Sequence, residues 1–271
     1  MELLDFIEAL GWRRHALALM FGLPRLLILL TVAPFLAGQI LGGQLKTAVL
    51  FAFYLPLHPL VYSQIPAEAD FSAPWVPLYL GLAAKEVLVG FVIALVSGLL
   101  FWAVQSAGFM IDNQRGASMA SGADPLSGEE TSPLGSLFFQ FLVLLFFATG
   151  AFCGFLTLFY QFYQLWPVFS WWPEVRLLSQ ALFFPKLVDW LMHLTVLLAG
   201  PVVVACLLTD IALGLINRFA SQLNVYILAM PIKSGVAMLI VLVYLGVLVR
   251  LAPGLFNDMT LALMGLGSLW P

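Results

Sequence analysis

The sequence contains little charge. Only 9% of its 271 residues are Asp, Glu, Lys or Arg, while 62% are hydrophobic, whereas a soluble domain carries roughly 25% charged residues. A chain of this composition has too few polar groups to cover its own surface, so lipid or partner subunits must cover it. The formal net charge of −3 provides no basic surface, so we expect no nucleic-acid partner.

Cysteines and catalytic motifs are also scarce. Cys153 and Cys206 lie in apolar runs, which favours small buried side chains over a disulfide or a metal site. His15, His58 and His193 are isolated in the sequence, without an HExxH motif or paired carboxylates at metal-ligand spacing. There is no Walker A loop for ATP hydrolysis. We therefore expect no catalytic residue, no metal ion and no cofactor.

One enzymatic alternative is an intramembrane serine protease that would use Ser118 with His193. The stretch Gly116-Ala-Ser118-Met-Ala120 partly matches a nucleophile elbow. Its last glycine is missing, and no α/β sheet is expected around it. The sequence favours a protein that is not an enzyme.

Long apolar runs dominate the chain. They predict helices, because backbone in lipid must satisfy its own hydrogen bonds and no run alternates like a barrel strand. The run at 131–173 contains no charge and predicts either two helices turning near Gly150 and Gly154 or one very long helix. Residues 2–12 predict a short amphipathic helix at the membrane interface. The apolar runs cover residues 15–37, 45–63, 78–111, 131–173, 187–216 and 225–252.

Prolines and charges interrupt these runs. A bundle that faced lipid alone would not tolerate them. We therefore predict an all-α, multi-helix integral membrane protein with bent, proline-broken helical hairpins, whose apolar surface faces protein over much of its area. The interrupting prolines are Pro24, Pro34, Pro56, Pro59, Pro201 and Pro231, and the interrupting charges are Arg25, Lys85, Glu86, Asp210 and Lys233.

Polar residues gather in one stretch, DIALGLINRFASQLNVYILAMPIKSG, at 210–235. Asp210 and Arg218 lie two turns apart, which favours pairing within the bundle over a direct transport role. Lys85 and Glu86 either extend from a helix end to the interface or form an ion pair facing another subunit or a pathway. We assign to a buried polar set that serves assembly the residues Lys85, Glu86, Asp210, Asn217, Arg218, Gln222, Asn224, Pro231 and Lys233.

A loop rich in Gly, Ser and Ala, DNQRGASMASGADPLSGEETSP, is predicted at 112–133. It divides a single membrane domain, 1–271, into N-terminal helices (1–111) and C-terminal helices (134–271). Two glycine pairs, Gly38/Gly42 and Gly150/Gly154, would allow close helix packing. A cluster of aromatic residues is typical of the aromatic belt at a membrane interface. It contains Trp166, Phe169, Trp171 and Trp172.

Three stretches resemble the SctT/FliR (SpaR) family, the export-apparatus proteins of type III secretion systems and bacterial flagella. They are LTDIALGLINRFASQLNVYILAMPIKSG (208–235), AAKEVLVGFVIAL (83–95) and AGFMIDNQRGASMASGADP (107–125). Segment 222–234 is more similar to the virulence (SctT) branch. One departure is Ala220-Ser221, where the family commonly has a proline before Gln-Leu.

The resemblance implies a subunit packed in a helical hetero-oligomer in the bacterial inner membrane, within a secretion-system base. SctR- and SctS-like subunits would surround with it a channel for unfolded proteins, and an SctU-like switch protein and needle or rod subunits would be further partners. The alternative from another class is a stand-alone proton-coupled small-molecule transporter.

The resemblance also places the family's plug-forming loop at residues 108–124. Small residues there would let backbone fill a narrow pore, and methionines would seal around varied substrates. The residues assigned to the plug are Gly108, Met110, Asp112, Arg115, Gly116, Ser118, Met119, Gly122 and Asp124.

Overall fold

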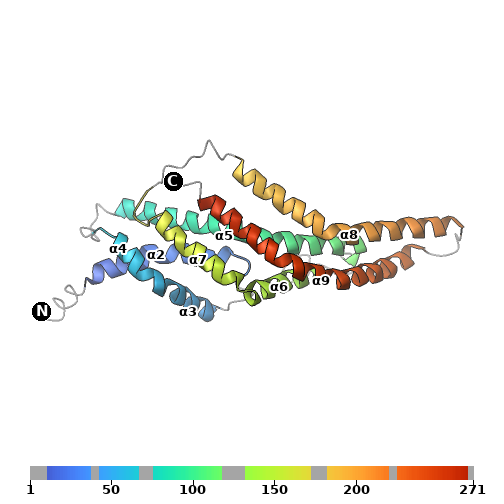
Figure 1. The fold of residues 1–271 in the computed structure, drawn as a ribbon, viewed down its shortest axis with the longest axis horizontal. Helices are drawn as coiled ribbons and strands as arrows, with labels where there is room; N and C mark the ends of the chain where they lie inside the picture. The colour runs from blue at the N-terminus through green and yellow to red at the C-terminus, as the bar shows by residue number, and fades with distance from the viewer. Residues whose placement is uncertain are drawn as a thin grey trace. The chain divides into compact units, whose positions relative to one another are not determined.

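Helices make up all the regular structure that is described (Figure 1). The computed structural model describes residues 11–37, 43–66, 76–117, 132–171, 182–219 and 225–267. The prediction of an all-α, multi-helix membrane protein is confirmed, whereas the predicted helix at 2–12 lies almost entirely outside the described residues. The elements are α2 (Trp12–Val32), α3 (Gly43–Tyr54), η1 (Leu55–Leu57), α4 (His58–Gln64), α5 (Val76–Arg115), α6 (Pro133–Ala148), α7 (Ala151–Leu165), α8 (Phe183–Phe219) and α9 (Val225–Gly267).

The lengths of these helices suit a membrane. Five segments are long and apolar enough to cross one, and the bent pair α6 and α7 makes up to six. The segments are α2, the run α3–η1–α4, α5, α8 and most of α9. An apolar helix of about 20 residues spans the hydrocarbon core, so α5, with 40 residues, and α9, with 43, exceed that length.

The chain forms two compact units. Unit 1 contains residues 1–98, 152–182 and 259–271, and unit 2 contains residues 99–151 and 183–258. Helices α5 and α9 each contribute to both units. Each unit has its own buried core.

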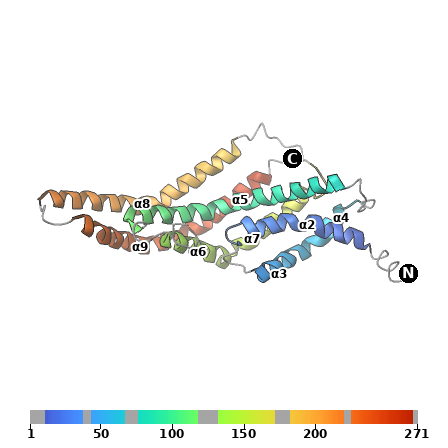
Figure 2. The ribbon, with the colours of Figure 1, turned by 180° about the vertical axis from the view of Figure 1, so that it is seen from behind.

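In unit 1, α2 packs beside α3 and α4 (Figure 2). Leu17, Phe21 and Leu29 of α2 are fully buried. Gly22 makes the packing possible, because a Cβ atom there would overlap the Tyr54 ring. The Tyr163 hydroxyl donates to the Gly22 carbonyl at 2.8 Å and thereby joins α7 to α2.

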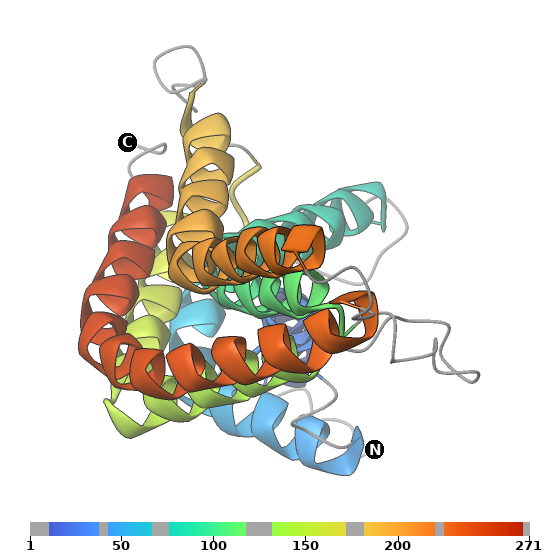
Figure 3. The same ribbon diagram turned by 90° about the vertical axis from the view of Figure 1, so that its right-hand side faces the viewer.

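In unit 2, α8 and α9 form a hairpin, and α8 is visibly bent (Figure 3). Pro201 lies inside α8, where its ring removes a hydrogen bond and kinks the helix axis. The aromatic core centres on Phe146, whose ring lies 5.3 Å from that of Phe101 and 5.2 Å from that of Phe256. Helices α5 and α6 cross where Gly108 faces Gly135 without side chains between them.

Three of the interrupting prolines do not end a helix. Pro24, Pro201 and Pro231 lie inside helices that continue past them. The segment at 45–63 is divided as expected, because Pro56 and Pro59 stand at the first turns of η1 and α4. Helix α2 likewise ends at Val32, just before Pro34. A proline at a first turn is tolerated because its missing N–H has no partner there anyway.

The charge-free run at 131–173 is two helices, α6 and α7, with a 77° bend between them. Gly150 makes the turn with a φ of +76°, a conformation that suits glycine. Gly154 lies in α7, and no atom lies within 4 Å of a Cβ built on either glycine. Among the described residues, Gly150 therefore forms a turn, and the Gly150/Gly154 pair makes no close helix packing. The other predicted pair, Gly38 and Gly42, lies outside the described residues.

Candidate functional site

One carboxylate in unit 2 joins the two ends of the α5–α6 loop (residues 116–132). Asp112 Oδ1 accepts from Arg115 Nε at 2.7 Å. Its Oδ2 accepts from Ser132 Oγ at 2.7 Å and from the Leu134 amide at 2.9 Å. Asp112 is only 3% exposed. We call Asp112, Arg115 and Ser132 the loop anchor.

The local sequence explains the loop anchor. Asp112 and Arg115 lie three residues apart in the last turn of α5, so they share a helix face. Ser132 is the N-cap of α6, accepts from the Gly135 amide at 2.9 Å and precedes Pro133 in the first turn. The positive end of the α6 dipole favours a carboxylate at this position. Asp112 and Arg115 are thus part of α5, and not of the loop as the sequence suggested.

The loop anchor also contacts α9. Arg115 Nη1 lies 3.4 Å from Ser234 Oγ. Gly116, with a φ of +81°, ends α5, and Met230 lies within 4 Å of its Cβ position. Met230 and Ser234 are one helical turn apart, so they share one face of α9. The end of α5 therefore rests on the part of α9 that belongs to the 208–235 stretch.

The ion pair of that stretch joins α8 to α9. Lys233 Nζ lies 3.0 Å from Asp210 Oδ1 and 3.2 Å from Oδ2. Asp210 thus pairs with Lys233, while Arg218 is exposed near the end of α8. Asn217 and Pro231 are also exposed, while Gln222 and Asn224 lie outside the described residues.

The other plug candidates are divided by the structure. Gly108 and Met110 lie within α5, where Gly108 packs against α6 and Met110 is exposed. Ser118, Met119, Gly122 and Asp124 lie outside the described residues. Gly108 therefore has a packing role that its assignment to a loop did not predict.

A second polar cluster is buried in unit 1. Arg25 Nε lies 2.7 Å from Glu86 Oε2, and Arg25 Nη2 lies 3.0 Å from Oε1. Lys85 Nζ lies 2.9 Å from Oε1. Arg25 and Glu86 are fully buried, and the Lys85 side chain is 5% exposed. We call these three residues the charge network.

The charge network caps the end of α7. Arg25 donates to the Phe162 and Trp166 carbonyls at 2.9 and 3.1 Å. Lys85 donates to the Val168 carbonyl at 2.6 Å and also reaches the carbonyls of Pro167 and Ser170. Carbonyls at a helix C-terminus lack intrahelical partners and attract cations. The two cations therefore fix the chain direction after α7.

This geometry differs from both interpretations of Lys85 and Glu86. Lys85 does not extend to an interface, because its ammonium group is surrounded by backbone carbonyls. The ion pair closes within the chain through Arg25, which the sequence marked only as an interruption. Trp166 is buried, with the Lys85 ammonium 5.8 Å from its ring centre, so it is not part of an interfacial belt. Trp171 is exposed.

Two histidines that are isolated in the sequence meet in unit 1. His15 Nδ1 and His58 Nε2 lie 2.9 Å apart, and the Tyr54 hydroxyl lies 2.9 Å from His58 Nδ1. The His15 ring stacks on Tyr62 with 4.5 Å between ring centres. This contact between α2 and α4 has no signal in the sequence, because its members are 43 positions apart.

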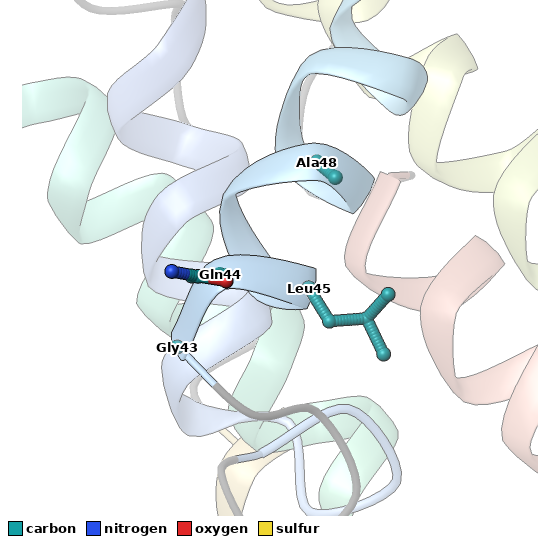
Figure 4. A pocket seen from close by; sticks show the side chains of 4 residues that line it. All are labelled: Gly43, Gln44, Leu45 and Ala48. Atoms are coloured by element: carbon teal, nitrogen blue, oxygen red, sulfur yellow. The ribbon is translucent and has the colours of Figure 1, made fainter.

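A pocket of about 630 Å³ opens beside the first turns of α3 (Figure 4). Gly43, Gln44, Leu45 and Ala48 line it, and none of these side chains is ionisable. The described part of its lining therefore offers no acid, base or nucleophile. Nor do three or more His, Cys, Asp or Glu residues meet anywhere in the part of the chain that the structure describes.

Fold and site together define a multi-pass helical membrane protein with paired internal charges and an anchored interhelical loop. The chain belongs to the family of bacterial export proteins designated family 1, which matches residues 16–259. The resemblance to the SctT/FliR family is thus confirmed.

Curated relatives agree with this assignment. The chain is 39% identical to the Yop proteins translocation protein T of Yersinia pestis over 82% of its own length and 83% of the relative's. It is 36% identical to the secretion system apparatus protein SsaT of Salmonella typhimurium, over 84% and 86% of the two chains. It is 30% identical to the flagellar biosynthetic protein FliR of Bacillus subtilis, over 66% and 69%.

Proposed function

We propose that this chain is the gate subunit of a type III secretion export channel in the bacterial inner membrane. Together with SctR- and SctS-like subunits it surrounds a path for unfolded proteins, and the α5–α6 loop closes that path. An SctU-like switch protein and needle or rod subunits are further partners. The relatives named above, which are translocation, secretion-apparatus and flagellar biosynthetic proteins, support an export role.

The loop anchor is the observation on which the gate assignment depends. Because one buried carboxylate binds both Arg115 and Ser132, the loop leaves and returns at a single point of unit 2. Such an arrangement fixes the end of α5 and the start of α6 to each other. The small residues of the loop sequence suit a backbone that fills a narrow pore.

The exposed surfaces of α8 and α9 support a hetero-oligomer. Only 28% of the apolar window of α8 and 22% of that of α9 are buried within the chain, against 67% for α5. The Asp210 side chain is 40% exposed, and the neighbouring Ile211 is 53% exposed. A carboxylate facing lipid is costly, so a partner polypeptide or an aqueous path must adjoin this surface.

Replacing part of the loop tests the proposal. Residues 118–131 are exchanged for a short Gly/Ser linker, which spares the loop anchor; a deletion beginning at Asp112 would remove it. Assembly is followed on native gels and leakage by dye or ion influx into the cells. The assembled variant should leak, while the same linker in place of residues 68–75 should not.

Two results would contradict the proposal. An assembled loop variant that stays as tight as the wild type would exclude a gate in this loop. A wild-type chain that purifies alone and transports a small molecule would favour the stand-alone transporter instead.

A further inference from the structure

We propose that His15 and His58 form a pH-sensitive switch between α2 and α4, which stays closed while the pair carries at most one positive charge and opens when both rings are protonated. The switch lies in unit 1 and is independent of the gate assignment. The two histidines are 43 positions apart, so their contact joins two helices and is not imposed by the periodicity of one.

The two ring nitrogens face each other as in an N–H···N hydrogen bond. His15 Nδ1 and His58 Nε2 are 2.9 Å apart, whereas the ring centres are 5.2 Å apart and the ring planes are 16° apart. A neutral imidazole has one donor and one acceptor nitrogen, while a protonated imidazole has two donors and no acceptor. The contact therefore requires that one of the two histidines keeps a lone pair at this position.

The number of protons on the pair decides whether the contact attracts or repels. With both rings neutral, the N–H of one ring donates to the nitrogen of the other. With one ring protonated, the hydrogen bond persists and is stronger, because its donor is charged. With both rings protonated, two N–H groups face each other between two positive charges, and the contact becomes repulsive.

Tyr54 of α3 holds the His58 ring at the contact. Its hydroxyl lies 2.9 Å from His58 Nδ1 and can donate to that nitrogen or accept from it. Tyr54 is 3% exposed, and its ring lies against Gly22 of α2. A protonated His58 would still donate to the Tyr54 hydroxyl, so double protonation disturbs the contact on the side of His15.

His15 is the partner that can move. It is exposed, and its ring stacks on Tyr62 of α4 with 4.5 Å between ring centres. The preceding residue, Arg14, donates to the Ile65 carbonyl at 3.0 Å and places its guanidinium 4.6 Å from the Tyr62 ring centre. Displacement of the His15 ring would therefore also disturb the packing of α2 on the end of α4.

The surrounding charges favour opening in acid. The ionisable side chains that contact the pair or its stacking partner are Arg14, Tyr54 and Tyr62. Within the described ranges, no salt bridge includes either histidine, so a second proton is added beside the positive charge of Arg14 without a carboxylate to compensate it. Histidine changes its charge between about pH 5 and pH 8, and the switch should respond within that range.

The test follows the thermal unfolding midpoint of the full chain in detergent from about pH 8 to about pH 5. The midpoint of the wild type should fall by about 2–4 °C more than that of His15→Phe, whose ring can still stack on Tyr62 but cannot be protonated. Protonation of carboxylates lowers both midpoints alike. His193→Ala, at an exposed position of α8, is the matched control and should follow the wild type.

A second measurement reports on the helices themselves. Spin labels are attached to Leu19→Cys on α2 and Ser63→Cys on α4, both at exposed positions, after Cys153 and Cys206 have been replaced by alanine. The distribution of label distances should broaden reversibly in acid when His15 is present and should stay unchanged in His15→Phe.

Two results would overturn the proposal: an equal fall of the midpoint in the wild type and in His15→Phe, or a label distance that does not depend on pH. Should His15→Phe fail to fold, His58→Gln replaces it. Its uncharged amide can still bind a neutral His15, and it should lack the additional fall of the midpoint in acid.

Discussion

The guanidinium of Arg25 and the carboxylate of Glu86 form a two-point contact, at 2.7 and 3.0 Å, inside a part of unit 1 where neither residue is exposed. A planar guanidinium matches both oxygens of a carboxylate at once. Glu86 Oε1 also lies 2.9 Å from Lys85 Nζ. One carboxylate therefore compensates two buried cations, and those cations in turn fix the end of α7.

We expect Glu86→Ala to destabilise the chain by about 3–5 kcal/mol, because breaking a buried ion pair leaves an uncompensated charge. Glu86→Gln should cost less, since its carbonyl oxygen still accepts a hydrogen bond. The thermal unfolding midpoint in detergent measures both effects. Asp189→Ala, at an exposed position of α8, is the control and should change little. Equal midpoints for Glu86→Ala and Asp189→Ala would contradict a structural role for the charge network.

The crossing of α5 and α6 should not tolerate a methyl group. A Cβ atom on Gly108 would lie 2.5 Å from the Gly135 amide nitrogen, which is backbone and has no rotamer to change. We expect Gly108→Ala to cost at least 1–3 kcal/mol, roughly the cost of overpacking. Gly246→Ala, inside α9, meets no atom within 4 Å in the chain and should stabilise α9 by about 1 kcal/mol. Denaturant unfolding compares the two, and shifts of the same sign would show that Gly108 does not mark a tight crossing.

Removing either partner of the Asp210–Lys233 pair should reduce assembly with the partner subunits more than it changes which substrates are exported. Because the two residues bind each other, Asp210→Ala combined with Lys233→Ala should be no worse than one substitution alone. Arg218→Ala lies outside the pair, so its effect should add to theirs. Native gels measure the assembled fraction. Fully additive losses from Asp210 and Lys233 would show that each acts separately.

The helical class followed from composition, because a chain so poor in charge has to bury its backbone polar groups in helices when it enters lipid. Two helices could be predicted for the charge-free run at 131–173, because a single membrane crossing needs only about 20 residues and this run is longer. The helix ends were less predictable. Asp112 and Arg115 resemble loop residues in sequence, yet they extend α5, because Ser132 and the Leu134 amide bind the Asp112 carboxylate and that carboxylate binds Arg115.

Ser132 was the residue of the loop anchor that sequence reasoning missed, although a signal existed. A serine followed by proline at the start of an apolar run is typical of an N-cap followed by a first helical turn. Ser234 and the His15–His58 pair had no such signal. Both contacts depend on which helices pack against each other. The periodicity of a helix shows which of its faces is apolar, but it does not show which other helix packs against that face.

The sequence by itself determined the family, the helical membrane class and the stretches in which polar residues concentrate, since these depend on local composition and on motifs along the chain. The tertiary structure alone decided the pairing of those residues. Arg25 meets Glu86 across 61 positions and Asp210 meets Lys233 across 23. Side-chain electrostatics select partners by distance in space, and packing of the helices sets that distance.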